Sequence, residues 1–191
     1  MTIDYIKEEI IEHFNLKNKI GYHYKQIQEL SNLIINTIKK SGCIFWCGNG
    51  GSAADSQHLA AELVGRFEIN RAPIKSIALT TDTSILTAIS NDYSFEQVFK
   101  RQIQALGSKK DLLIVISTSG NSKNIIEAVK EAKKKGIKTF ALLGKSGGKI
   151  KKLVNKNIVI PSNKVSRIQE MHILIGHIVS GLAEKKIFKK N

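Results

Sequence analysis

Short apolar segments alternate with helical patterns along most of this chain, and this alternation constrains the fold more than any other feature. The apolar segments cover residues 43–47, 74–79, 112–116, 139–143 and 158–160. The main helical patterns cover residues 52–66, 95–106, 122–135 and 165–185. Strands that alternate with helices form a parallel sheet covered by helices on both faces. The sequence therefore predicts an α/β fold, a three-layer α-β-α sandwich around a five-stranded parallel sheet.

The first 40 residues lie outside this alternation. Apolar residues recur there with helical spacing from about Ile3 to Ile38, with a break near Gly21. Their apolar stripes are longer than one small sheet can cover, so we expect these N-terminal helices to contact other subunits. The remaining residues, 41–191, form the predicted α/β core, and the whole chain of 191 residues is expected to be one domain.

The first apolar segment ends in the glycine-rich sequence CGNGGSAADS. Glycines allow the backbone to turn sharply and to approach a ligand, and the next helix offers free N–H groups at its positive end. We expect Ser52 to be the N-cap of that helix, with its hydroxyl facing the same ligand. The spacing of Gly48, Gly50 and Ala53 also fits the dinucleotide-binding fingerprint, and Glu68 lies about 20 residues beyond the strand.

The third apolar segment ends in a second such loop, STSGNS, at residues 117–122. A dinucleotide-dependent oxidoreductase needs only one loop of this kind, whereas two loops on one sheet suit a small, phosphorylated, polyhydroxylated ligand. A third glycine-rich stretch, LLGKSGGK, has Thr139 where a P-loop requires glycine. We therefore expect residues 144–148 to form an ordinary loop, and nucleotide hydrolysis is rejected.

Ionisable side chains follow the first loop and recur in the last helix. His58 and Glu62 are four residues apart and so share one helical face. Gln169 and His177 are eight apart, about 80° around a helix, so their side chains could converge on one site. His172 points elsewhere by the same geometry and is expected to be structural.

The cysteine spacing and the charge limit the other classes of function. Cys43 and Cys47 lack the spacing of a zinc knuckle, and we expect free thiols in the core. The net charge of +14 comes largely from lysines in helical patterns and at the C-terminus, without the interleaved aromatics of single-strand binders. Nucleic acid is therefore not an expected partner, although a positive field attracts anionic substrates.

No stretch approaches the roughly 18 apolar residues that span a bilayer, and the first residues do not resemble a signal peptide. A membrane partner is not expected, and the predicted location is the cytoplasm.

The motifs taken together resemble the phosphoheptose isomerase family, whose members have a flavodoxin-like sugar isomerase (SIS) fold. The resemblance runs through CGNGGSAADSQHLAAELVGRF, SNDYSFEQVF, ISTSGNSKN, LLGKSGGK and RIQEMHILIGH, and covers nearly the whole chain. Its most specific parts are His58 and Glu62 followed by Gly-Arg-Phe at 65–67, and the last helix with Gln169 and His177.

The resemblance implies conversion of D-sedoheptulose 7-phosphate to D-glycero-D-manno-heptose 7-phosphate, in a homotetramer. It implies one zinc per subunit, bound by His58, Glu62, Gln169 and His177, with Glu62 and His177 as the acid–base pair. Substrate would be held by Asn49, Gly50, Gly51, Ser52, Asn91, Asp92, Ser117, Thr118, Ser119, Ser122 and Gln169. A carboxylate and an imidazole suit aldose–ketose isomerisation, which needs a base for the carbon acid and an acid for the carbonyl oxygen.

An alternative remains open. The stretch SAADSQH also resembles relatives that bind a replication-initiator protein, so a non-catalytic adaptor of the same fold, binding sugar phosphate or protein, is the main rival. Ser166 stands where the family often has an acidic residue, so the chain departs from the family pattern at a position that could contact the substrate or a neighbouring subunit. Retention of both Glu62 and His177 favours the enzyme.

Overall fold

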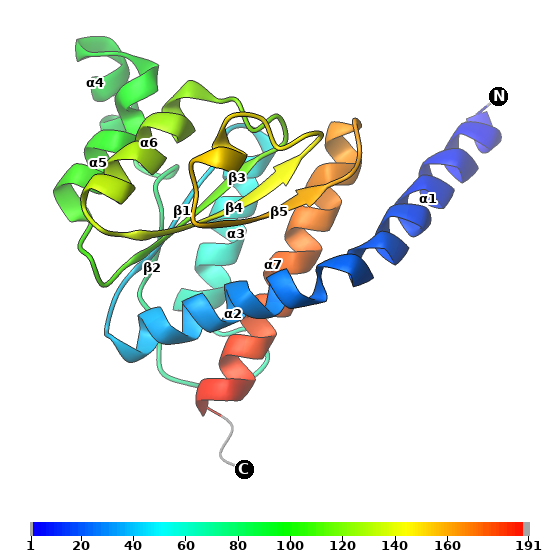
Figure 1. Ribbon diagram of the computed structural model, residues 1–191, viewed down its shortest axis with the longest axis horizontal. Coiled ribbons are helices and arrows are strands. Elements are labelled where there is room, and N and C mark those ends of the chain that lie inside the picture. The colour runs from blue at the N-terminus through cyan, green and yellow to red at the C-terminus, as the bar shows by residue number, and fades with distance from the viewer. Residues whose placement is uncertain (1, 189–191) are drawn as a thin grey trace.

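The computed structural model describes residues 2–188 and has a five-stranded parallel sheet at its centre (Figure 1). The strands lie in the order β2-β1-β3-β4-β5. They are β1 (Ile44–Cys47), β2 (Ser76–Ala78), β3 (Leu112–Ser117), β4 (Lys138–Gly144) and β5 (Lys156–Ile160). The predicted α/β sandwich is confirmed, and each strand overlaps the apolar segment that predicted it.

The sheet has a switch point between β1 and β3. From β1 the chain passes to β2 on one side, and later returns to place β3 on the other side of β1. Ile44 pairs with both Ser76 and Leu112, and Cys47 pairs with Val115. The loops after β1 and β3 therefore leave the sheet side by side, which is where parallel sheets bind ligands.

Helices cover both faces of the sheet. Alternate residues of each strand point to opposite faces, so Ile114 packs with the helices α2 (Tyr24–Lys39), α3 (Gly51–Val64) and α7 (Val165–Phe188). Val115 packs on the other face with α5 (Val98–Leu106) and α6 (Lys123–Lys134). The strands β1, β3 and β4 are buried throughout except at Lys138, which matches their nearly continuous apolar sequences.

The N-terminal region is helical as predicted. Helix α1 (Thr2–Lys19) meets α2 through the 3-10 turn η1 (Ile20–His23), which contains the predicted break at Gly21. Helix α1 projects beyond the sheet, whereas α2 lies across α7 (Figure 1).

One helix, α4 (Thr83–Asp92), was not predicted. It contains no fully buried residue, and its core-facing stripe is limited to the partly buried Leu86 and Ile89, which is too short to predict a helix. The predicted helix 95–106 begins as the 3-10 turn η2 (Phe95–Gln97), and a further 3-10 turn, η3 (Ile150–Lys152), follows β4. Within residues 2–188, no helix is long and apolar enough to cross a membrane.

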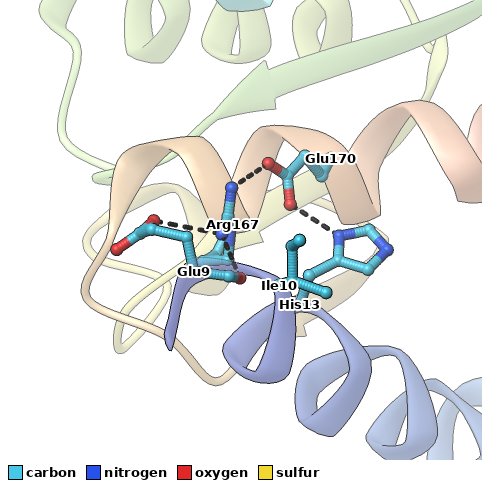
Figure 2. A pocket seen from close by; sticks show the side chains of 5 residues that line it. All are labelled: Glu9, Ile10, His13, Arg167 and Glu170. Atoms are coloured by element: carbon cyan, nitrogen blue, oxygen red, sulfur yellow. Dashed lines mark hydrogen bonds and ion pairs between the residues drawn. The ribbon is translucent and has the colours of Figure 1, made fainter. Parts of the chain in front are cut away.

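Ionic contacts hold α1 against the first turns of α7 (Figure 2). Arg167 donates to the backbone carbonyl of Glu9 at 2.6 Å and to its carboxylate at 3.1 Å, and it also pairs with Glu170. His13 Nδ1 donates to the Glu170 carboxylate at 2.7 Å. These contacts position α1 beside the turn of α7 that carries Gln169.

His172 makes the stability of the fold depend on pH. It is fully buried on α7, where its Nε2–H donates to the Leu143 carbonyl at 3.0 Å. Burial lowers the pKa of His172 to about 4, although this hydrogen bond opposes the shift. The unfolded chain, with a histidine pKa near 6.5, therefore binds this proton more tightly than the folded chain does.

We expect the free energy of unfolding to decrease as the pH falls from about 6.5 towards 4, by up to about 3 kcal/mol from this residue. Denaturant titrations of the wild type and of His172→Gln at pH 7.5 and pH 5 measure the effect. The glutamine keeps a donor for Leu143 but does not titrate, so the variant should lose less stability than the wild type. Equal losses in both proteins would contradict the prediction.

Candidate active site

The first loop joins β1 to α3 through closely packed backbone. Gly48 lies so close to the first turn of α3 that a Cβ at this position would come within 2.4 Å of the Ser52 carbonyl oxygen. The N-cap of α3 is Gly50, whose φ of +56° suits glycine. The prediction that Ser52 is the N-cap is therefore wrong: the glycine lets the helix begin at Gly51, and Ser52 is buried in the first turn.

The second loop joins β3 to α6, and its hydroxyl groups shape the turn. The buried Ser117 hydroxyl accepts the Gly120 N–H at 3.1 Å, and the Ser119 hydroxyl accepts the Asn121 N–H at 3.2 Å. Ser122 is the N-cap of α6, with no hydrogen bond from its own side chain to the helix. Together with the half-buried Thr118, these predicted phosphate-binding residues surround the start of α6.

A pair of asparagines connects the two loops. Asn49 Nδ2 donates to Asn124 Oδ1 at 3.0 Å, and Asn124 Nδ2 donates back to Asn49 Oδ1 at 2.8 Å. Asn124 is buried and was not singled out from the sequence, although it ends the motif ISTSGNSKN. Asn49 is therefore fixed relative to the second loop, as a residue holding the sugar beside the phosphate would need to be.

His58, Glu62 and His177 form a cluster between α3 and α7. His58 Nε2 donates to Glu62 Oε1 at 3.0 Å and lies 3.4 Å from His177 Nε2. The predicted shared face of His58 and Glu62 is confirmed. The structure adds His177, which lies 119 positions after His58 in the sequence. Helix α7 can approach α3 this closely because residue 176 is a glycine. A Cβ at this position would lie only 2.3 Å from the Leu59 side chain.

The other predicted site residues lie at two different places. The Gln169 amide packs on Gly51, where a Cβ would lie 2.4 Å from its Nε2, so Gln169 contacts the first loop. Asn91 and Asp92 are exposed at the end of α4, where Asn91 Nδ2 donates to the Asp92 carboxylate at 2.9 Å. Their role as substrate ligands stays a prediction.

Two neighbours of the cluster were missed from the sequence. The ring of Phe67 stacks on that of His177, with centroids 5.6 Å apart and planes 27° apart. Asp55 lies one turn before His58 on α3, and burial raises its pKa to about 6 against the opposing effect of His58. The spacing of Asp55, three residues before His58 on one helix, could have revealed their proximity, whereas no local spacing relates Phe67 to His177.

The cluster has the composition and spacing of a metal site. One donor atom from each of His58, Glu62 and His177 lies within 4.8 Å of the other two. Zinc bonds of about 2.0–2.2 Å in tetrahedral geometry place neighbouring ligand atoms about 3.3 Å apart. The separations of 3.0 and 3.4 Å from His58 Nε2 to Glu62 Oε1 and His177 Nε2 are close to that value, and imidazole with carboxylate suits a divalent transition metal. The three side chains could therefore hold such an ion.

Comparison with known proteins identifies the family. The family model for the SIS domain matches residues 15–144. A phosphoheptose isomerase from Nitratiruptor sp. is 51% identical over 184 residues, covering 96% of this chain and 98% of the relative. The chain belongs to the phosphoheptose isomerase family. A Helicobacter pylori phosphoheptose isomerase is 47% identical over the full length of both chains.

Solved structures of the phosphoheptose isomerase family share this fold. Phosphoheptose isomerase GmhA from Neisseria gonorrhoeae superposes with a TM-score of 0.92 at 39% identity, covering 97% of this chain and 100% of that one. A phosphoheptose isomerase from Francisella tularensis superposes with a TM-score of 0.94 at 34% identity, covering 97% of this chain and 99% of that one. The resemblance to this family of isomerases, predicted from the motifs, is confirmed.

The cluster predicts metal binding by the purified protein. We expect one divalent transition-metal ion per chain, and at least about a tenfold weaker affinity in His58→Ala and His177→Ala because each loses one ligand. Elemental analysis and calorimetric titration of the chelated protein with zinc measure both quantities. His23→Ala, which alters a histidine outside the cluster, is the control and should bind as the wild type does. Unchanged affinity in both cluster variants would exclude the site.

Proposed function

We propose that this phosphoheptose isomerase family member converts D-sedoheptulose 7-phosphate to D-glycero-D-manno-heptose 7-phosphate, a precursor of nucleotide-activated heptose. The observation that carries the proposal is the cluster in which the carboxylate of Glu62 and the imidazole of His177 both contact His58. An isomerase of this kind needs a base and an acid close together, and the cluster supplies both.

Each part of the site has a place in the reaction. The second loop binds the phosphate through Ser117, Thr118, Ser119 and Ser122. The first loop holds the sugar through Asn49, Gly50, Gly51 and Ser52, with Gln169, Asn91 and Asp92 as further contacts. Glu62 moves the proton between C1 and C2 of the sugar through an enediol, while His177 exchanges protons with the two oxygens. No atom is added or lost, as isomerisation requires.

Zinc, one ion per subunit, is the proposed metal, with His58, Glu62, Gln169 and His177 as its ligands. Two imidazoles, a carboxylate and an amide oxygen form a donor set that suits zinc outside thiolate-rich structural sites. A bound divalent ion polarises a carbonyl oxygen. Assays with and without a chelator distinguish this role from one in which the ion only organises the side chains.

We further propose that the chain is a homotetramer whose subunits meet through residues 1–40, next to a core formed by residues 41–191 of the same domain. Helix α1 has an exposed apolar stripe comprising Ile3, Ile6, Ile10 and Phe14. Contiguous exposed apolar patches often mark contacts between proteins. The exposure of Asn91 and Asp92 in the single chain fits a site that a neighbouring subunit helps to enclose. A cytoplasmic location stays a prediction.

The tetramer predicts a mass four times that of the 21.2 kDa chain. Light scattering coupled to size-exclusion chromatography should give this mass for the wild type. The double variant Ile6→Asp, Ile10→Asp should give a smaller species, because it places charges in the apolar contact. Lys7→Asp changes the charge of the same helix without altering the apolar stripe and is the control. A stable monomeric wild type would contradict the proposal.

The acid–base assignment predicts the effect of removing the carboxylate. We expect Glu62→Gln to lower kcat for sedoheptulose 7-phosphate at least about 100-fold, since the amide does not accept the proton. Glu68→Gln, which loses only an exposed ion pair with Lys185, should behave as the wild type. Full turnover in Glu62→Gln would refute the assignment. A wild type that binds sugar phosphate without isomerising it would instead support the adaptor.

A further inference from the structure

A buried ion pair lies beside the cluster, at the end of α3 distant from the first loop. Arg71 Nε donates to Glu184 Oε1 at 2.9 Å, and each side chain is only 1% exposed. Removing two charges from water is costly, and a hydrophobic pair of similar size is often as stable. The surroundings of this pair show what its two charges hold in place.

Arg71 binds the C-terminal end of α3. Its Nη2 donates to the backbone carbonyl of Glu62 at 2.8 Å, and its Nη1 donates to the carbonyls of Leu63 at 2.8 Å and Gly65 at 3.1 Å. The last carbonyls of a helix have no intrahelical partner and form the negative end of its dipole. The guanidinium therefore caps the turn of α3 that carries Glu62.

Glu184 binds the segment that follows α3. Its two carboxylate oxygens accept the backbone N–H groups of Phe67 at 2.8 Å, Glu68 at 2.8 Å and Ile69 at 3.0 Å. Burial alone would raise the pKa of Glu184, but these three bonds and Arg71 outweigh burial and lower it. Glu184 thus stays ionised and fixes the start of this segment.

Phe67 transmits this contact to the cluster. Glu184 and His177 are seven residues apart on α7, about two turns, so both face the same side of the helix. The Phe67 ring stacks on His177 and also covers Gly181, where a Cβ would lie 3.3 Å from the ring. The backbone of Phe67 is therefore held by Glu184 while its ring lies against His177.

From these contacts we propose that Arg71, Glu184 and Phe67 form a clamp that positions Glu62 and His177 relative to each other for proton transfer and metal binding. Arg71 holds the turn of Glu62, Phe67 holds the ring of His177, and the buried ion pair joins the two. All three are positioning residues, and the inference rests on the proposed roles of Glu62 and His177.

The test uses variants of the full-length protein that weaken the clamp at separate points. Glu184→Gln removes the charge and one acceptor at nearly constant volume, and Phe67→Leu removes the stacked ring without touching the ion pair. We expect kcat to fall about 10- to 100-fold in each, with KM for sedoheptulose 7-phosphate changed by less than about threefold. Zinc affinity should fall about tenfold, and Phe67→Tyr, which keeps the ring, should restore both values.

The control is Val129→Ala. Val129 is fully buried on α6, on the opposite face of the sheet, so its truncation destabilises the fold without altering the clamp. At a temperature where circular dichroism shows every variant folded, Val129→Ala should keep the wild-type kcat and zinc affinity. If Val129→Ala loses as much kcat as the clamp variants do, their loss reflects stability alone and the proposal is wrong.

Other outcomes separate this inference from the proposed function. Wild-type kcat and zinc affinity in folded Phe67→Leu would overturn the clamp even if Glu62→Gln is inactive. Full activity in Glu62→Gln would overturn the proposed role of Glu62 instead, and a wild type that binds sugar phosphate without isomerising it would overturn the proposed function. If Glu184→Gln does not fold, the pair of variants at Phe67 still decides, because both leave the ion pair intact.

Discussion

Where α7 crosses α3, Gly176 lies directly against Leu59, with space for no side chain on the glycine. These two residues adjoin His177 and His58 in the sequence, so a close contact between the helices coincides with the cluster. Because packed interiors leave little free volume, the contact sets how closely the two imidazoles approach. The 3.4 Å between their nitrogens is thus a consequence of helix packing, and the chemistry proposed for the site depends on it.

The sheet organises the other half of the site. Because β1 and β3 are parallel neighbours at the switch point, the two loops that follow them emerge together. The reciprocal amide bonds between Asn49 and Asn124 then fix one loop against the other. A phosphate bound at the start of α6 and a sugar held by the first loop would share one platform, from which α3 leads to the cluster.

The cluster itself lies outside the apolar core. His58 is half exposed and Glu62 partly so, and neither is buried among the residues that stabilise the sheet. Side chains in such a position need specific supports, because general packing does not restrict them. Backbone capping by Arg71, the stacked ring of Phe67 and the Gly176 contact supply such supports from three directions. Leu59 serves both the fold and the cluster, because it is fully buried in the core and its contact with Gly176 brings the two helices together.

The sequence by itself determined the five strands, the N-terminal helices, both loops and the shared face of His58 and Glu62. These features follow from local periodicity and turn chemistry, which neighbouring residues encode. Helix α4 was missed because its core-facing stripe is limited to the partly buried Leu86 and Ile89, and Gly50 replaced Ser52 as the N-cap because a positive φ is not visible in a pattern. Only the tertiary structure brought His177, Phe67 and Asn124 to their partners, because contacts between distant segments depend on how whole helices pack.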